Sequence, residues 1–119
     1  MYTQTLKWIK CERNAWCPFL TVNLQHPHFR NLEGVYIIWY GGQTPWTVYV
    51  GQGNIADRIA RHRSEPQILQ YSHLGLFVTW ASVIQPLRDG VEAYLADKLS
   101  PKAGEAHPQA NVVAVNLPW

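Results

Sequence analysis

Two runs of β-branched and aromatic residues, joined by a short loop rich in Gly and Pro, constrain the fold of this chain most. Residues 34–40 read GVYIIWY and residues 47–50 read TVYV, with Gly41, Gly42 and Pro45 between them. Runs of this composition are typical of strands, and a Gly/Pro loop between them is typical of a turn. The sequence therefore predicts a β-hairpin.

Further strands are predicted outside the hairpin. The run at 76–84 is almost wholly apolar, so it predicts a third strand in a central position. A shorter strand-like run lies at 20–24 in an otherwise irregular N-terminal region, and the apolar run at 112–115 predicts an edge strand in the tail.

A helix is predicted directly after the hairpin. Asn54 is a candidate N-cap, and Ile55 and Ile59 form an apolar i, i+4 pair. Pro66 should end this helix, and a short second helical piece is predicted at 67–71.

A later helix is predicted from about residue 88 to residue 99, where Val91, Leu95 and Leu99 have the spacing of a core-facing stripe. The resulting order of strands and helices predicts an α+β fold in which helices flank a small sheet. A chain of 119 residues is expected to form one domain, 1–119, with an N-terminal extension at 1–33 and a C-terminal tail at 104–119.

Composition indicates a globular chain and leaves its ligand open. Hydrophobic residues make up 47% and charged residues 15% of the sequence, which argues against disorder. The formal net charge of +2 permits nucleic-acid binding without arguing for it. Six Trp and six Tyr are a high aromatic content, and any that are exposed are able to stack on bases.

The N-terminal region and the two cysteines suggest a compartment. We expect a cytoplasmic protein, because the sequence lacks an apolar run of about 20 residues and the apolar stretch of a signal peptide. Cys11 and Cys17 are then expected to be buried thiols, not a disulfide. A zinc site with His26 and His28 is the alternative, although the spacing fits no common zinc pattern.

Five side chains are candidates for chemistry, and each also has a plain structural interpretation. Arg58 and His62 share one helix face, which is usually a solvated basic surface. Glu92 lies beside the apolar stripe, where a carboxylate needs either an ion-pair partner such as Arg88 or a metal ion. Tyr36 and Tyr49 lie on strands, where tyrosines are mostly structural.

The order of these elements resembles the GIY-YIG nuclease superfamily. Gly34-Val35-Tyr36 and Tyr49-Val50-Gly51 are variants of the two name motifs. The segment 54–62, NIADRIARH, is similar to the motif helix that carries an arginine and a histidine, and the segment 90–95, GVEAYL, is similar to the one that supplies a glutamate. The resemblance covers residues 34–103.

This resemblance implies a three-stranded antiparallel sheet flanked by helices, and a metal-dependent endonuclease that hydrolyses phosphodiester bonds of DNA. Glu92 would hold a divalent cation, Mg²⁺ or another such as Mn²⁺, and Arg58 would contact the scissile phosphate. Tyr36 would be the general base or would position the water. Tyr49 and His62 would orient the nucleophile or the phosphate.

Departures from the family pattern leave a second hypothesis. No asparagine follows the Glu92 helix before Asn111, and Gln52 stands where some members carry lysine. The alternative is therefore a nucleic-acid-binding or partner-binding module of the same fold with little or no activity. A homodimer or a protein partner could supply specificity in either case.

Overall fold

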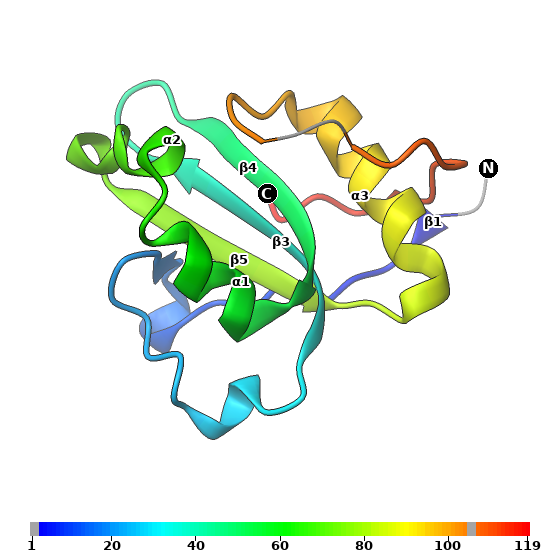
Figure 1. The fold of residues 1–119 in the computed structure, drawn as a ribbon, viewed down its shortest axis with the longest axis horizontal. Coiled ribbons are helices and arrows are strands. Elements are labelled where there is room, and N and C mark those ends of the chain that lie inside the picture. Colours follow the sequence, from blue (N-terminus) through cyan, green and yellow to red (C-terminus); the bar gives the residue numbers. More distant parts are fainter. Residues whose placement is uncertain (1–2, 105–106) are drawn as a thin grey trace.

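The predicted hairpin is the centre of the fold. In the computed structural model, which describes residues 3–104 and 107–119, β3 (Glu33–Tyr40) pairs with β4 (Trp46–Asn54) in antiparallel register. The third predicted strand, β5 (Leu76–Ser82), pairs antiparallel with the other side of β3. The α+β class predicted from the sequence is confirmed (Figure 1).

The main sheet has four strands, so the expectation of three is wrong. The additional strand is β2 (Cys17–Pro18), which pairs antiparallel with β5 and gives the strand order β2-β5-β3-β4. The strand predicted at 20–24 is also wrong, because these residues form turns. A proline at position 18 is tolerated because β2 is an edge strand.

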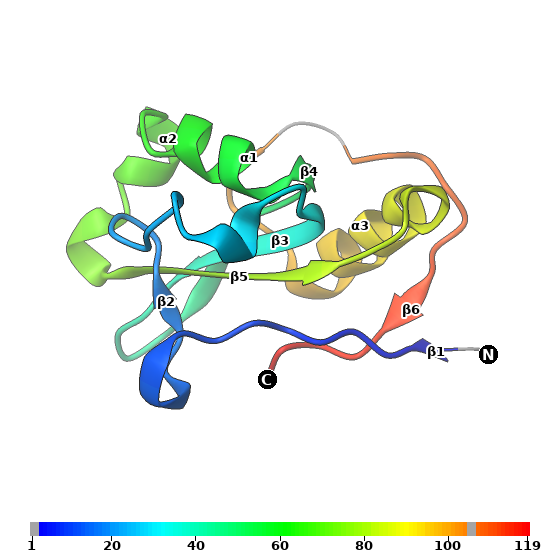
Figure 2. The same ribbon diagram turned by 90° about the horizontal axis from the view of Figure 1, so that it is seen from below.

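The two ends of the chain form a separate small sheet. β1 (Thr3–Gln4) pairs in parallel with β6 (Ala114–Val115), which falls within the predicted strand of the tail. Figure 2 shows this pair on the side of the main sheet opposite α1 (Ile55–His62) and α2 (Pro66–Leu69). Residues 105 and 106 of the predicted tail lie outside the described residues.

Helices and turns complete the fold. The long helix α3 (Gln85–Leu99) follows β5, and its C-cap residue Ser100 has a positive φ. Residues 3–104 and 107–119 also contain three short 3₁₀ segments: η1 (Glu12–Asn14), η2 (Pro27–Phe29) and η3 (Ser72–Leu74). None of the helices in the described ranges combines the length and the apolar character needed to cross a membrane.

Alternation along β3 builds a core on each face of the main sheet. Tyr36 and Ile38 face α1 and pack in one buried cluster with Ile59. Val35, Ile37 and Trp39 face the other way and pack in a second cluster with residues of α3 and β6. The side chain of Tyr36 therefore points toward the helix that carries Arg58 and His62.

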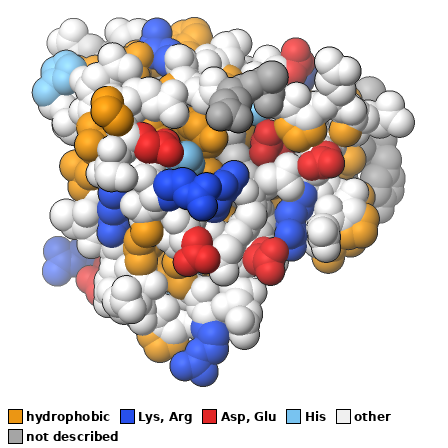
Figure 3. All heavy atoms as spheres, viewed as in Figure 1, with side chains coloured by type: hydrophobic (Ala, Val, Ile, Leu, Met, Phe, Trp, Pro, Cys, Tyr) orange, Lys and Arg blue, Asp and Glu red, His pale blue; other side chains and the backbone are white. Residues whose placement is uncertain are grey.

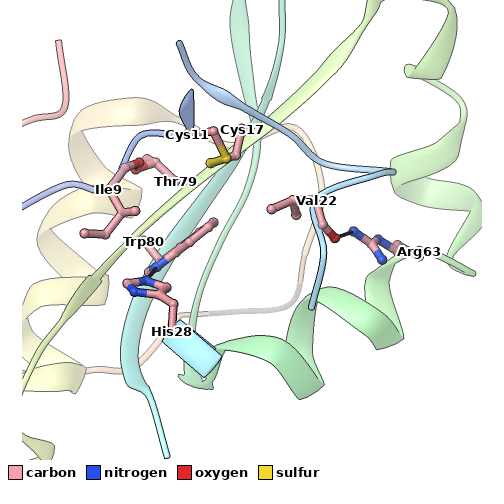
Figure 4. Close-up of a disulfide and its surroundings, with 8 residues drawn as sticks. All are labelled: Ile9, Cys11, Cys17, Val22, His28, Arg63, Thr79 and Trp80. Atoms are coloured by element: carbon pink, nitrogen blue, oxygen red, sulfur yellow. Dashed lines mark hydrogen bonds between the residues drawn. A yellow bond between two sulfur atoms is a disulfide. The ribbon is translucent and has the colours of Figure 1, made fainter. Parts of the chain in front are cut away.

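The prediction of free thiols at Cys11 and Cys17 is wrong, because the two form a disulfide (Figure 4). The chain turns back between them: the Cys11 amide donates to the carbonyl of Ala15, and the two Cα atoms are 5.0 Å apart. This bond also removes both sulfurs from the zinc alternative. His28 has a different role, since its Nε2 accepts a hydrogen bond from the Trp80 indole at 3.0 Å.

Reduction of this disulfide is expected to lower the free energy of unfolding by about 2 kcal/mol, because the bond closes a small loop in the unfolded chain. The measurement is urea unfolding with and without a reductant. Cys11→Ser is the control. Its free energy of unfolding should equal that of the reduced wild type and should not change when the reductant is added. Equal stability of the oxidised and reduced wild type would contradict the expectation.

Candidate active site

Four elements carry the five predicted site residues. Tyr36 comes from β3, Tyr49 from β4, Arg58 and His62 from α1, and Glu92 from α3. Both helices contact the hairpin, since α1 and α3 each pack against β3 and β4.

The start of α1 fixes its direction. The Asn54 side chain accepts a hydrogen bond from the Asp57 amide at 3.1 Å, so the predicted N-cap is confirmed. Ile55 and Ile59 are fully buried and hold one face of the helix on the sheet. The adjacent face then carries Arg58 toward β4 and His62 toward Tyr36.

A buried series of hydrogen bonds links Tyr36, His62 and Glu65. The Tyr36 hydroxyl lies 2.6 Å from His62 Nε2, and His62 Nδ1 lies 2.6 Å from Glu65 Oε1. Tyr36 is fully buried and His62 is 3% exposed, so water competes little for these bonds. Glu65 is partly exposed and connects the buried pair to solvent.

Burial lowers the pKa of His62 below its ordinary value. Glu65 opposes this shift, while the cations Arg58 and Arg61 add to it. A neutral imidazole with a carboxylate at Nδ1 holds its proton there, because a carboxylate accepts but does not donate. Nε2 is then an acceptor for the Tyr36 hydroxyl.

The pKa of Tyr36 is raised, first by burial and then by the neighbouring Tyr49. The Arg58 guanidinium lowers it through its charge and a side-chain hydrogen bond, and the charge of Glu92 raises it. The phenol is therefore neutral at pH 7. The same interactions place Tyr36 within electrostatic reach of both Arg58 and Glu92.

A glycine on β4 makes room for the Tyr36 ring. Gly51 is directly opposite Tyr36 in the hairpin, and a Cβ at this position would overlap the Tyr36 hydroxyl. Two residues later, Gly53 has a φ of +128°, a backbone conformation that residues with a side chain rarely adopt. Gly53 lies against the Arg58 side chain. Gly51, the glycine of the second motif, is therefore required here because any side chain would collide with the Tyr36 ring.

Tyr49 lies beside the same pair. Its ring centre is 4.3 Å from that of His62 and 6.1 Å from that of Tyr36, and the two phenol rings are nearly parallel. Tyr49 is half-buried, so one part of this aromatic group reaches the surface.

Backbone contacts position Arg58. Its Nε donates to the carbonyl of Gln52 at 3.1 Å, and the Gln52 side chain donates to Asp89 on α3 at 2.8 Å. Arg58 is half-buried, with its guanidinium close to the Tyr36 phenol. Figure 3 shows Lys and Arg side chains at the centre of this face, with acidic side chains around them.

Glu92 has a partner that the sequence did not indicate. It is 8% exposed, and its Oε2 lies 3.0 Å from Nδ1 of His107. The alternative prediction, an ion pair between Glu92 and Arg88, is wrong. Arg88 instead forms an ion pair with Glu33 at 3.0 Å and donates to the Val83 carbonyl. Glu92 therefore contacts the returning tail, on the α3 side of the site.

Sequence reasoning missed three contributors. Glu65 follows His62 by three residues, so helical spacing could have indicated it. Gln52 contributes through its carbonyl, which a side-chain motif does not report. His107 is separated from Glu92 by the end of α3 and part of the tail, so no local pattern predicts the contact.

The donor set limits the kind of metal ion that fits. No group of three or more His, Cys, Asp or Glu side chains in the described part of the chain could hold a metal. The predicted Mg²⁺ or Mn²⁺ at Glu92 would therefore be held by this one carboxylate and by waters, since Mg²⁺ keeps several waters and needs only one or two carboxylates. This ion stays a prediction.

Comparisons of the chain with families of known proteins, with curated proteins and with solved structures found no match. The GIY-YIG resemblance therefore depends on the five motif elements and their order.

The free energy of unfolding should decrease as the pH is lowered, because of His62. Its lowered native pKa means that the unfolded chain, with a histidine pKa near 6.5, binds the proton first. The free energy of unfolding is thus expected to decrease as pH falls from about 6.5 through the lower native pKa. Denaturation at a series of pH values measures this slope.

His62→Gln should remove that part of the slope. The matched control is His73→Gln, which changes an exposed histidine outside the site and should leave the slope intact. An unchanged slope in His62→Gln would show that His62 does not titrate as described.

Proposed function

We propose that this chain is a metal-dependent endonuclease of the GIY-YIG type that hydrolyses phosphodiester bonds of DNA. The observation that supports this most is the buried Tyr36–His62–Glu65 series, with Arg58 and Glu92 acting on the same phenol. A phenol beside a guanidinium, with a carboxylate whose charge reaches the same phenol, matches the needs of a reaction that activates water and stabilises charge on phosphate.

The proposed mechanism begins with the proton of the attacking water. The neutral Tyr36 phenol cannot accept this proton unless its own proton leaves at the same time. His62 Nε2 is 2.6 Å away and has an acceptor lone pair, so the phenol proton would pass to it as the water proton passes to Tyr36 Oη. Because Tyr36 is fully buried, this step requires that the attacking water reach Oη when the substrate is bound. Glu65 then stabilises the imidazolium that forms.

Arg58 stabilises the phosphate in this proposal. The water oxygen would form a bond to phosphorus as the bond to the leaving oxygen breaks, and negative charge would gather on the remaining phosphate oxygens. The leaving oxygen would take a proton from solvent water. The bond from Arg58 Nε to the Gln52 carbonyl fixes the guanidinium while its terminal nitrogens can still face the phosphate. Tyr49, whose ring lies beside those of Tyr36 and His62, would orient the nucleophile or the phosphate.

Glu92 is the proposed ligand of the divalent cation. When bound, the cation would supply Lewis acidity to the phosphate oxygens and lower the pKa of the attacking water. His107 orients the Glu92 carboxylate through its hydrogen bond to Oε2.

A plasmid assay tests the activity. Purified wild type is expected to nick supercoiled DNA in Mg²⁺, and Glu92→Ala and Arg58→Ala are each expected to lose roughly 10²-fold in rate. Arg61→Ala is the matched control, because Arg61 is an exposed arginine on the same helix. Equal nicking by wild type, Glu92→Ala and Arg58→Ala would contradict the proposal.

The binding-module alternative predicts a different result. DNA would then bind in a salt-sensitive way, the binding would survive Glu92→Ala, and wild type would not nick. Partner binding alone predicts neither nicking nor DNA binding.

The cytoplasmic location stays a prediction. The Cys11–Cys17 disulfide bears on it, because disulfides persist in oxidising compartments and are rare in the cytosol. In a cytoplasmic protein the two cysteines would be reduced for most of its lifetime.

A further inference from the structure

We propose that a second site, a pocket rich in tryptophan on the opposite face of the sheet, binds a base of single-stranded nucleic acid. The pocket has a volume of about 570 Å³ and lies between the hairpin turn and the C-terminal end of α3. Four of its lining residues are tryptophans: Trp16, Trp39, Trp46 and Trp119. We call it the tryptophan pocket.

Two of the four indoles in this pocket are unusually accessible. Trp46 is 45% exposed and Trp119 is 58% exposed, although large aromatic side chains usually stabilise a fold by being buried. Two exposed indoles at one pocket provide flat surfaces on which a base can stack.

The rings are held in place without a ligand. Trp16, Trp39 and Trp119 pack edge to face, with ring centres 5.0 to 6.1 Å apart. The Trp46 indole donates a hydrogen bond to the Ser100 carbonyl at 2.9 Å. A pocket whose walls are already ordered loses little side-chain freedom when a ligand binds.

Charge at the pocket favours an anionic ligand. Lys98 lines it, Lys10 Nζ lies 4.5 Å from the centre of the Trp16 ring, and Lys102 Nζ lies 5.5 Å from that of Trp46. None of the described lining residues is an Asp or Glu. Cations beside aromatic faces match a base that is flanked by phosphates.

Single strands fit this chemistry better than duplex DNA or an apolar peptide. Bases in a duplex are paired and stacked on each other, so their faces are not free to enter a pocket. An apolar peptide would use the indoles but would not use the positive charge of the lysines.

The pocket is connected to the candidate active site by one segment. After α3, Lys102 and Ala103 donate backbone hydrogen bonds to the carbonyls of Thr47 and Val48, so the chain follows β4. Gly104, at the end of this segment, lies against the Tyr49 ring. From Trp46 to Tyr49 is three residues, or about 10 Å along a strand.

A strand with one base in the tryptophan pocket would therefore place its phosphates near the edge of β4 that leads to Tyr49. This link to cleavage rests on the proposed nuclease function, whereas binding in the pocket does not.

Binding of two oligonucleotides tests the proposal. The probes are a fluorescent single-stranded thymidine oligonucleotide and an abasic oligonucleotide of equal length, with the Glu92→Ala protein in EDTA so that no cleavage occurs. Because stacking of one base is worth a factor of about ten, the abasic probe is expected to bind roughly tenfold more weakly. Anisotropy gives both dissociation constants.

The ratio of the two constants is the readout, because loss of charge or of folded protein alters both constants together. Trp46→Ala should bring the ratio close to one. Ile84→Ala, which changes an exposed apolar residue outside the pocket, should leave it unchanged. The proposal would be overturned by a ratio near one in the Glu92→Ala protein with Trp46 intact. A ratio that the added Trp46→Ala substitution does not alter would also overturn it.

This result is independent of the plasmid assay. Failure to nick leaves the difference between the two probes in place. Equal binding of the probes leaves any nicking activity in place.

Discussion

The hydrogen bond between the Tyr36 hydroxyl and His62 Nε2 is the interaction on which the candidate site depends. It joins β3, an inner strand of the main sheet, to α1 inside the core, where a polar group without a partner would cost about 1–3 kcal/mol. Burial raises the pKa of one partner and lowers that of the other, so both are neutral at pH 7. The site is therefore uncharged at this bond, and transfer of the phenol proton to Nε2 would separate charge unless the phenol gained another proton at the same time.

The hairpin brings the other groups to this bond. Its register shifts between Ile38 and Trp39, so that Val48 is an extra residue on β4. From Glu33 to Ile38 the register is regular, so Tyr49 lies opposite Ile38 on the face that also carries Tyr36, and Gly51 leaves space for the phenol. Local backbone geometry thus decides which side chains can share the site, before any ligand is present.

Local features could be predicted from the sequence, and contacts between distant segments could not. The hairpin and the Asn54 cap depend on neighbouring residues, so composition and spacing predicted them. The strand at β2 has only two residues and exists because it pairs with β5. The disulfide needs the tight turn after Cys11, and the His107–Glu92 bond needs the tail to return to α3. Neither contact has a signature in the sequence.

The tautomer of His62 tests the central claim most directly, and nitrogen NMR of the imidazole at pH 7 measures it. The account predicts a neutral ring with the proton on Nδ1 and a lone pair on Nε2, and a change at Nε2 in Tyr36→Phe. A proton on Nε2, or an imidazolium at pH 7, would contradict it, because the phenol proton would then have no acceptor.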